Sequence, residues 1–142
     1  MPDLIIERLD PSLPMPKYAK EGDAGFDLYA AESIPDMARI PYVMSTGIRV
    51  HIPKGYELQI RSRSSLASNG VFVVNSPGTI DEGYRGEIKV ILGQTGDRGV
   101  FINKGDRIAQ AVLAPVTRAN IVEGVVSTDT ERGEAGFGST GR

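Results

Sequence analysis

The fold class is decided by residues 47–61, GIRVHIPKGYELQIR. Apolar and polar residues alternate strictly over 48–52 and again over 56–61, and the turn-forming sequence Pro-Lys-Gly separates the two runs. A period of two residues places successive side chains on opposite faces of a β-strand. We therefore predict two strands, each with one buried face, that are joined as a hairpin at residues 53–55.

Short β-branched runs of the same kind recur along the chain, at residues 4–8, 71–74, 87–92, 100–102, 108–112 and 120–125. Most of the 17 glycines and 9 prolines lie between them, where tight turns are needed. Only residues 64–69 have the sequence of a helical turn, with Ser64 or Ser65 as its N-cap and Gly70 at its end. The pattern predicts an all-β sandwich or barrel with one short helix, followed from residue 127 by a flexible tail.

The composition limits the possible partners. Sixteen Lys and Arg residues against eighteen Asp and Glu residues give a net charge of −2, so no global positive field attracts nucleic acid. The absence of cysteine excludes disulfides, thiolate metal sites and a thiol nucleophile, and His51 alone cannot build a histidine-rich metal site. No apolar run is long enough to span a membrane and no signal peptide is evident, so we expect a soluble, cytoplasmic protein.

The glycine-rich tail at residues 132–141, RGEAGFGSTG, interleaves a cation, hydroxyls and an aromatic ring. Glycine exposes backbone N–H groups, Arg132 can bind a terminal phosphate, Ser139 and Thr140 can donate hydrogen bonds, and Phe137 can cover a base. Such a tail suits a phosphate clamp with a stacking surface. It is equally compatible with an ordinary disordered C-terminus.

Two internal segments also suit phosphate chemistry. Residues 61–67, RSRSSLA, place two arginines and three hydroxyls beside the short helix, although a capped helix with solvated arginines has the same sequence. Residues 78–86, GTIDEGYRG, place Asp81 in a turn between strands, where a carboxylate can orient water for attack on phosphorus. Alternatively, Asp81 caps the turn and Tyr84 packs over the hairpin.

Two more segments are compatible with plain sheet sequence. In residues 23–30, the alternation of Phe26 and Leu28 puts Asp27 on the face opposite the apolar residues. In residues 105–113, Gln110 is an unexpected polar member of an apolar strand.

In order and spacing, these five segments resemble the five signature motifs of the trimeric dUTPase family. The resemblance implies a jelly-roll-like β-barrel over residues 1–126 and a C-terminal arm over residues 127–142 that closes over the active site. It also implies a homotrimer whose active sites are shared between subunits. The implied reaction is hydrolysis of dUTP to dUMP and pyrophosphate by attack of water on the α-phosphate, which keeps uracil out of DNA and supplies dUMP for thymidylate synthesis.

The resemblance also implies residue roles. Asp81 would activate the water, Tyr84 would pack beneath the deoxyribose, and magnesium would be chelated by the triphosphate with Asp27 as an outer-shell partner. The remaining substrate-binding positions fall into three groups: Asn75, Thr79, Ile80 and Lys89 for uracil; Arg63, Ser64, Ser65 and Gln110 for the inner phosphates; and Arg132, Gly138, Ser139 and Thr140 for the γ-phosphate, with Phe137 stacked on uracil.

The chain departs from the family pattern at Ser65, where many relatives have glycine, and at Glu134-Ala135, which bring a negative charge and a methyl group to the tail. Two alternative functions stay open. One is a dCTP deaminase of the same fold, although Ile91 stands where that enzyme needs a glutamate. The other is a nucleotide-sensing regulatory protein that uses the same pocket.

Overall fold

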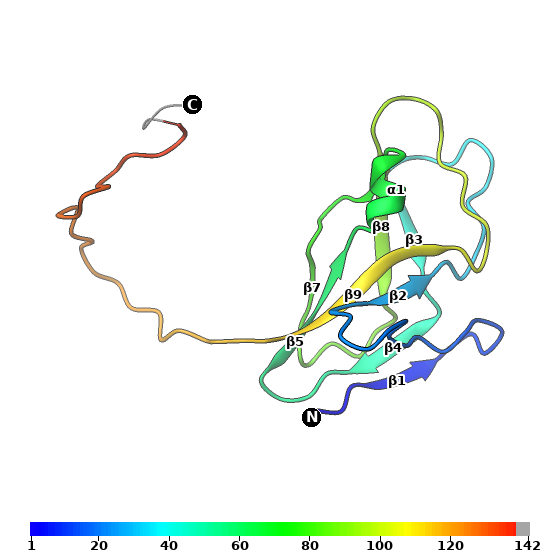
Figure 1. Ribbon diagram of the computed structural model, residues 1–142, viewed down its shortest axis with the longest axis horizontal. Helices are drawn as coiled ribbons and strands as arrows, with labels where there is room; N and C mark the ends of the chain where they lie inside the picture. The colour runs from blue at the N-terminus through cyan, green and yellow to red at the C-terminus, as the bar shows by residue number, and fades with distance from the viewer. Residues whose placement is uncertain (139–142) are drawn as a thin grey trace.

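The structure is a computed structural model that describes residues 1–138, and it confirms the all-β prediction (Figure 1). Within that part of the chain it contains one short helix and nine strands. They are, in chain order, β1 (Ile5–Arg8), β2 (Phe26–Tyr29), β3 (Tyr42–Ser45), β4 (Ile48–His51), β5 (Tyr56–Arg61), α1 (Ser64–Ser68), β6 (Val71–Val73), β7 (Gly78–Ile80), β8 (Lys89–Gln94) and β9 (Arg107–Pro115).

The strands form three antiparallel sheets, with the strand orders β1-β4, β2-β9-β5-β7 and β3-β8-β6. Inward-facing residues from all three sheets make one hydrophobic core, which includes Leu28, Met44, Ile52, Leu58, Ile88, Leu92 and Ile108, all buried. The hydrogen bonds of the described strands do not run continuously around the core, so the barrel is a set of packed sheets and not a closed ring.

The alternation in residues 47–61 buries the expected faces, but the expected hairpin is wrong. Ile48 and Val50 of β4 and Leu58 and Ile60 of β5 are buried, as the two-residue period predicts. However, β4 pairs with β1, whereas β5 pairs with β7 and β9. The turn at residues 53–55 carries the chain from one sheet to another, because local alternation specifies a buried face and not a pairing partner.

Helix α1 begins one residue earlier than its serines suggest. Its N-cap is Arg63, which has an extended backbone and makes no side-chain capping bond, so the expected Ser64 or Ser65 cap is wrong. The Arg63 carbonyl accepts the first helical hydrogen bond from Ala67 N at 2.9 Å. Gly70 follows the helix at φ +87°, a conformation that favours glycine, as the sequence predicts.

Two of the expected strands do not form. Residues 100–102 contribute buried Val100 and Ile102 to the core and a single backbone hydrogen bond from Ile34, too little for a strand. Residues 120–125 lie in an extended arm that leaves the barrel after β9 (Figure 1), and its backbone has no neighbouring strand in the described chain. A β-strand needs a partner for its N–H and C=O groups, so sequence propensity alone does not produce one.

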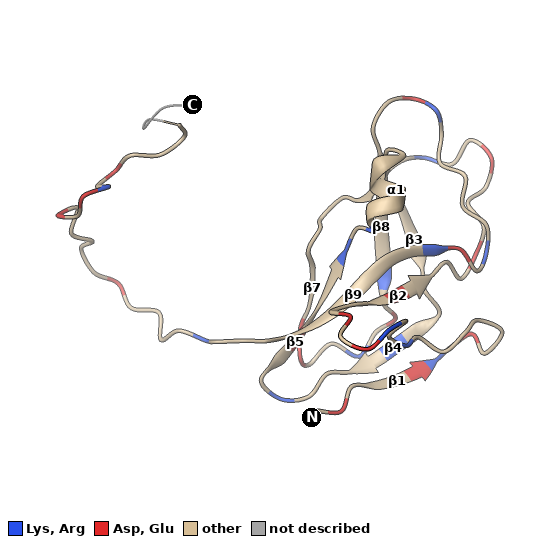
Figure 2. Cartoon of the chain, in the orientation of Figure 1, with Lys and Arg blue, Asp and Glu red and all other residues tan. Residues whose placement is uncertain are grey.

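Basic and acidic segments alternate over the barrel and along the arm (Figure 2), in keeping with the nearly balanced charge. Helix α1 has only five residues. Over residues 1–138, none of the helices has the length and apolar character needed to cross a membrane.

Candidate active site

The first cluster of candidate residues joins Asp27, Arg63 and Arg107. Because Phe26 and Leu28 point into the core, Asp27 projects from the opposite face of β2, as the alternation predicts. Arg63 follows the end of β5, and its Nε donates to Asp27 Oδ1 at 3.0 Å. Arg107 Nη1 lies 3.7 Å from Asp27 Oδ2. Two guanidinium groups are thus held at one carboxylate, which concentrates positive charge at the edge of the sheet.

Gln110 belongs to the same cluster. It pairs with Asp27 across strands β2 and β9, and its Nε2 donates to Ser62 O at 3.1 Å. Asp27 and Gln110 line one pocket of about 290 Å³, together with Gly25. A Cβ at Gly25 would lie 2.9 Å from Gln110 Oε1 and 3.2 Å from the Ala111 carbonyl, so glycine is required for this close approach.

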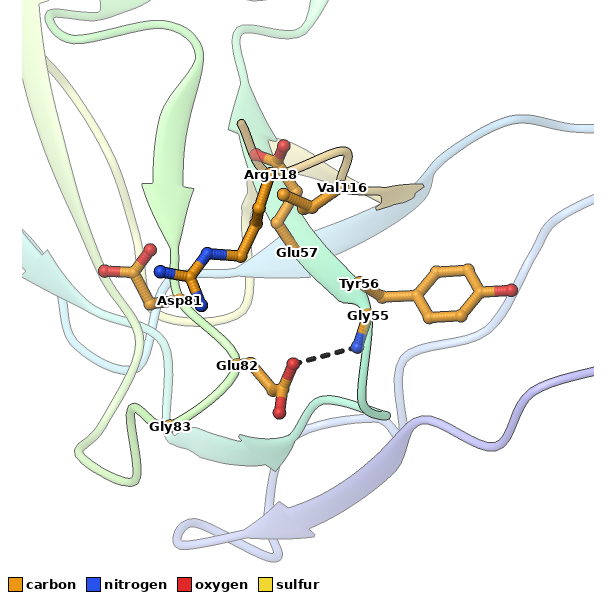
Figure 3. Close-up of a pocket in the computed structure, with 8 residues that line it drawn as sticks. All are labelled: Gly55, Tyr56, Glu57, Asp81, Glu82, Gly83, Val116 and Arg118. Atoms are coloured by element: carbon orange, nitrogen blue, oxygen red, sulfur yellow. Dashed lines mark hydrogen bonds between the residues drawn. The ribbon is translucent and has the colours of Figure 1, made fainter. Parts of the chain in front are cut away.

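The second cluster surrounds Asp81, which follows β7 and is exposed. Figure 3 shows Asp81 at a pocket of about 440 Å³, with the guanidinium of Arg118 pointing towards it. Glu57 and Glu82 line the same pocket, and Glu82 Oε2 accepts a hydrogen bond from Gly55 N at 2.8 Å. The carboxylate of Asp81 is therefore open to water in a recess that also contains a cation.

Tyr84 lies over its own turn. Its hydroxyl donates to Glu87 O at 2.8 Å, and a Cβ added at Gly86 would come within 2.7 Å of the tyrosine Cζ. The side chain nevertheless remains 44% exposed. The ring thus packs on its own turn, which connects two sheets and is not the expected hairpin, and still offers apolar surface to a ligand.

The residues expected to read a base lie on the two strands that flank this turn. Thr79 and Ile80 are in β7, where Ile80 pairs with Leu58, and Lys89 is the first residue of β8. Asn75 precedes β7, and its Nδ2 would lie 3.1 Å from a Cβ at Gly78. These residues and Asp81 thus lie on one continuous stretch of chain, whose strands β7 and β8 belong to different sheets.

The described part of the arm, up to Gly138, does not bring its residues to either cluster. Arg132 Nε donates to Ala135 O at 2.9 Å, which closes a local turn. Phe137 is fully exposed and has a positive φ of 53°, and Gly138 has a φ of 78°. The segment that contains them lies away from the barrel (Figure 1). Ser139 and Thr140 lie outside the described residues.

The two clusters occupy opposite ends of β5. Pairing of Ile80 with Leu58 places Asp81 beside the first residues of that strand, whereas Arg63 comes two residues after its last. At about 3.3 Å per residue, the four steps from Glu57 to Arg61 separate the two ends by about 13 Å. In one chain, Asp81 lines one pocket, whereas Asp27, the partner of the two arginines, lines another.

Sequence reasoning missed three residues of these clusters: Arg107, Glu82 and Arg118, whose guanidinium lies at the Asp81 pocket. Arg107 lies within the quoted segment 105–113 but was not assigned, although its position next to a strand that carries Gln110 is a usable signal. Glu82 stands beside Asp81, but its partner Gly55 is 27 residues away. No local pattern could reveal that contact.

The described residues hold no group of three or more His, Asp, Glu or Cys side chains that could by themselves enclose a metal ion. Asp27 is a single carboxylate that already contacts two arginines. Magnesium is commonly held by one or two carboxylates together with substrate phosphates and waters. The residues present therefore fit a metal that enters with a phosphate ligand.

An antiparallel β-fold that holds two arginines at one carboxylate, and presents an open carboxylate in a separate pocket, defines a candidate hydrolase of phosphoanhydrides. A family model described as dUTPase matches residues 12–141. The chain is 47% identical over 140 residues to the deoxyuridine 5′-triphosphate nucleotidohydrolase of Clostridium kluyveri, which covers 98% of each chain. It is 49% identical over 131 residues to the enzyme of the same name from Zymomonas mobilis, covering 92% of this chain and 90% of the relative.

Solved structures agree. The dUTPase of Staphylococcus bacteriophage 80alpha with dUpNHpp has a TM-score of 0.81 and 26% identity, and the match covers all of both chains. This chain belongs to the dUTPase family. The prediction of the family from five short segments is confirmed.

Proposed function

We propose that this protein hydrolyses dUTP to dUMP and pyrophosphate, with Asp81 as the group that activates water for attack on the α-phosphate. The supporting observation is the exposed Asp81 carboxylate at a pocket that also holds the guanidinium of Arg118. A carboxylate so placed can accept a proton from water as the oxygen approaches phosphorus. The pyrophosphate leaves as the new oxygen–phosphorus bond forms.

Arg63, Ser64, Ser65 and Gln110 are proposed to hold the inner phosphates. The Asp27–Arg63 ion pair fixes the direction of one guanidinium, and a preorganised donor stabilises developing charge better than a mobile one. Magnesium bound to the triphosphate would neutralise part of its charge. Asp27, already paired with arginine, would contact the metal through water.

The uracil and sugar are proposed to bind at the turn between β7 and β8 that contains Asp81. Asn75, Thr79 and the backbone near Ile80 and Lys89 would read the base edge. The exposed part of Tyr84 would pack beneath the deoxyribose, where a ribose 2′-hydroxyl has no room. In this role, Tyr84 would exclude UTP by a steric clash with the ribose 2′-hydroxyl.

We further propose that the active protein is a homotrimer with shared sites, in which residues 1–126 are the barrel and 127–142 are the arm that closes on substrate. The separation of the two clusters at opposite ends of β5 supports sharing, because one triphosphate must contact both. The extended segment between β9 and the arm also exposes Ile121, Val122 and Val125, which are 93%, 75% and 102% exposed. Apolar residues in a strand-like segment without a partner favour burial against another subunit.

Within the closed site, Arg132, Gly138, Ser139 and Thr140 are proposed to bind the γ-phosphate, and Phe137 to stack on uracil. The described conformation of Arg132, which closes a turn within the arm, must then open so that its guanidinium can reach a phosphate. Ordering of the arm over the nucleotide would exclude bulk water.

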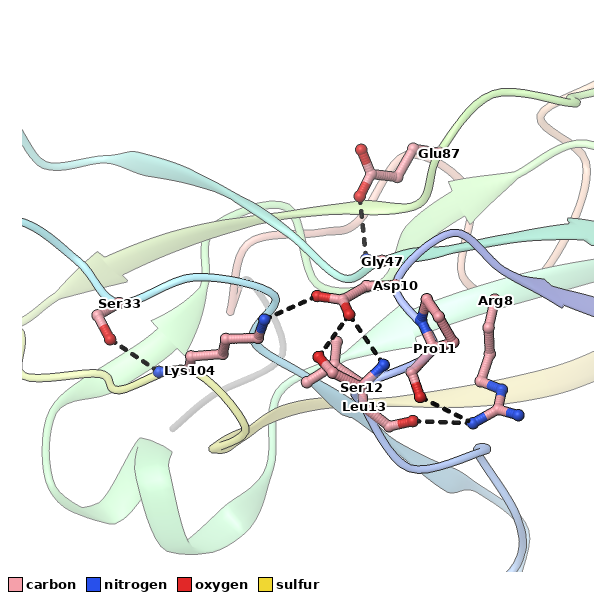
Figure 4. A network of polar contacts seen from close by, with 9 residues as sticks. All are labelled: Arg8, Asp10, Pro11, Ser12, Leu13, Ser33, Gly47, Glu87 and Lys104. Atoms are coloured by element: carbon pink, nitrogen blue, oxygen red, sulfur yellow. Dashed lines mark hydrogen bonds and ion pairs between the residues drawn. The ribbon is translucent and has the colours of Figure 1, made fainter.

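Deamination is disfavoured by the strand that follows the turn. Ile91, at the position of the deaminase glutamate, is an apolar residue of β8 paired with Val43. The nearby Glu87 is also occupied, since its Oε2 accepts a hydrogen bond from Gly47 N at 2.9 Å (Figure 4). Neither side chain is free to move protons at a cytosine ring.

The direct test is pyrophosphate release from dUTP, dCTP, dTTP and UTP, with magnesium or with EDTA. We expect release from dUTP alone at an appreciable rate, and only with the metal. Hydrolysis in ¹⁸O-labelled water should place the label in dUMP, because the α-phosphate is attacked. Label in pyrophosphate, or ammonia from dCTP, would contradict the proposal.

A further inference from the structure

The turn that carries Asp81 is rigid within itself. Tyr84 N donates to Asp81 O at 3.0 Å, and Arg85 Nη1 donates to the carbonyls of Glu82 at 2.8 Å and Tyr84 at 3.1 Å. These bonds fix residues 81–85 relative to one another. They do not fix the turn relative to the barrel. Residues 81–85 can therefore still move together, as one rigid tip, relative to the sheets.

The two ends of the turn are anchored in sheets. Ile80 pairs with Leu58 in β5, and Ile88 N donates to Ile48 O at 2.9 Å. Between these anchors, Glu87 Oε2 accepts from Gly47 N near the second anchor. Within residues 81–85, Glu82 makes the side-chain contact to a distant segment, since its Oε2 accepts from Gly55 N at 2.8 Å. Glu82 is adjacent to Asp81, so this bond acts next to the reacting carboxylate (Figure 3).

Gly55 also contacts the base of the arm. Its carbonyl accepts a hydrogen bond from Val116 N at 2.9 Å, one residue after β9 ends. Its φ of +87° allows its N–H and C=O to serve two different segments, and that conformation favours glycine. The Asp81 turn and Val116, where the chain leaves β9, are thus tied to the same residue, Gly55.

We propose that Glu82 is a positioning residue, which holds the Asp81 turn against Gly55 and so fixes the catalytic carboxylate relative to the α-phosphate and to the base of the arm. This inference rests on the proposed function. A displacement of about 1 Å at a reacting group can lower turnover by about a hundredfold, so a single bond beside Asp81 has a measurable effect. Glu82 itself exchanges no proton with substrate.

The test compares Glu82→Ala, Glu82→Gln and wild type by steady-state pyrophosphate release from dUTP. We expect Glu82→Ala to lower kcat about tenfold to a hundredfold and to leave KM within about twofold, because substrate binding relies on other residues. Glu82→Gln should restore kcat to within about threefold of wild type, since its amide oxygen also accepts from Gly55 N. Asp97→Ala, which removes a carboxylate from an exposed loop that contributes to neither cluster, is the control and should stay near the wild-type rate.

Hydrogen–deuterium exchange of the segment 53–56 gives a readout that does not depend on turnover. Exchange should be faster in Glu82→Ala and normal in Glu82→Gln. The inference is overturned by an unchanged kcat in Glu82→Ala, by failure of Glu82→Gln to recover, or by unchanged exchange at this segment. A wild-type protein that releases no pyrophosphate from dUTP would instead refute the proposed function.

Discussion

Arg63 Nε and Asp27 Oδ1 form a hydrogen-bonded ion pair of 3.0 Å that joins the end of β5 to β2. The two side chains are 21% and 28% exposed, so the pair is accessible to a ligand. One carboxylate cannot satisfy the five N–H donors of a guanidinium. Arg63 can therefore bind a phosphate with its other N–H groups while it keeps its ion pair with Asp27. We propose that Asp27 orients Arg63 to donate hydrogen bonds to a phosphate group of the substrate.

Replacing Arg63 with lysine should lower kcat/KM for dUTP about tenfold to a hundredfold. Lysine keeps the charge but loses the planar fork that can contact a carboxylate and a phosphate together, and hydrogen bonds to charged groups contribute about 1.5–3 kcal/mol. Arg61→Lys is the matched control, because Arg61 bonds to Gln59 on the same strand. Equal activity in the two variants would refute the role of Arg63.

Replacing Gly86 with alanine should reduce discrimination between dUTP and UTP. The new methyl group would overlap the ring of Tyr84, which lies within 2.7 Å of that position. Because the ring is partly exposed, it can move aside at little cost in stability. We expect the melting temperature to change little and the ratio of kcat/KM values for dUTP and UTP to fall. Gly83→Ala, where nothing lies within 4 Å, is the control. An unchanged ratio would argue against Tyr84 as the sugar selector.

The contacts of Asp10 predict that the folded state loses stability in acid (Figure 4). Hydrogen bonds from the Ser12 hydroxyl and from Lys104, then the Ser12 backbone N–H, lower the pKa of Asp10 from 3.8 to about 2. A carboxyl with a lowered folded-state pKa stabilises the fold above about pH 4, and that stabilisation is lost as pH falls towards 2. The stability difference between wild type and Asp10→Asn should therefore shrink over this interval.

Chemical denaturation at several pH values from 2 to 7 measures this difference. Lys104→Ala removes one of the two partners, so it should show a smaller effect of the same sign. If the free energy of unfolding of the wild type exceeds that of Asp10→Asn by a constant amount down to pH 2, the lowered pKa assigned to Asp10 is contradicted.

Ending the chain at Glu131 should leave the assembly intact but lower kcat/KM for dUTP by at least about tenfold. The deletion removes Arg132 and the glycine-rich segment proposed to close on the γ-phosphate, and it keeps the apolar residues at 121–126 proposed to contact a neighbour. Native mass spectrometry should give three times the mass of the truncated chain. Full activity after truncation would remove the arm from the mechanism.

Much of the barrel and of the site could be predicted from local pattern. Alternation identifies which face of β4 and β5 is buried, and it places Asp27 opposite Phe26 and Leu28. Strand partners could not be predicted, because pairing depends on segments far away in sequence. Residues 53–55 look like a hairpin turn for this reason, although they connect two sheets.

The arm shows the other limit of sequence reasoning. Residues 120–125 have strand propensity, yet in one chain they are exposed and unpaired. A segment with strand propensity forms a strand only where a partner supplies hydrogen bonds and an apolar face. The Glu82–Gly55 bond was equally beyond prediction, since neither residue carries a sign of the other.

The central claim is that Asp81 of one subunit and Arg63 of another act on the same dUTP. It is tested most directly by combining two inactive variants, Asp81→Asn and Arg63→Ala, through co-refolding of equal amounts. Each variant alone should bind nucleotide poorly or turn it over about a hundredfold more slowly than wild type. In mixed trimers, some sites receive an intact Asp81 and an intact Arg63 from different chains.

Random mixing should restore about a quarter of the wild-type rate of pyrophosphate release, because each intact residue is present at a given site half the time. That recovery is the result the account predicts. A mixture with no more activity than its two components measured separately would show that the two residues do not meet across a subunit boundary, and would contradict the account.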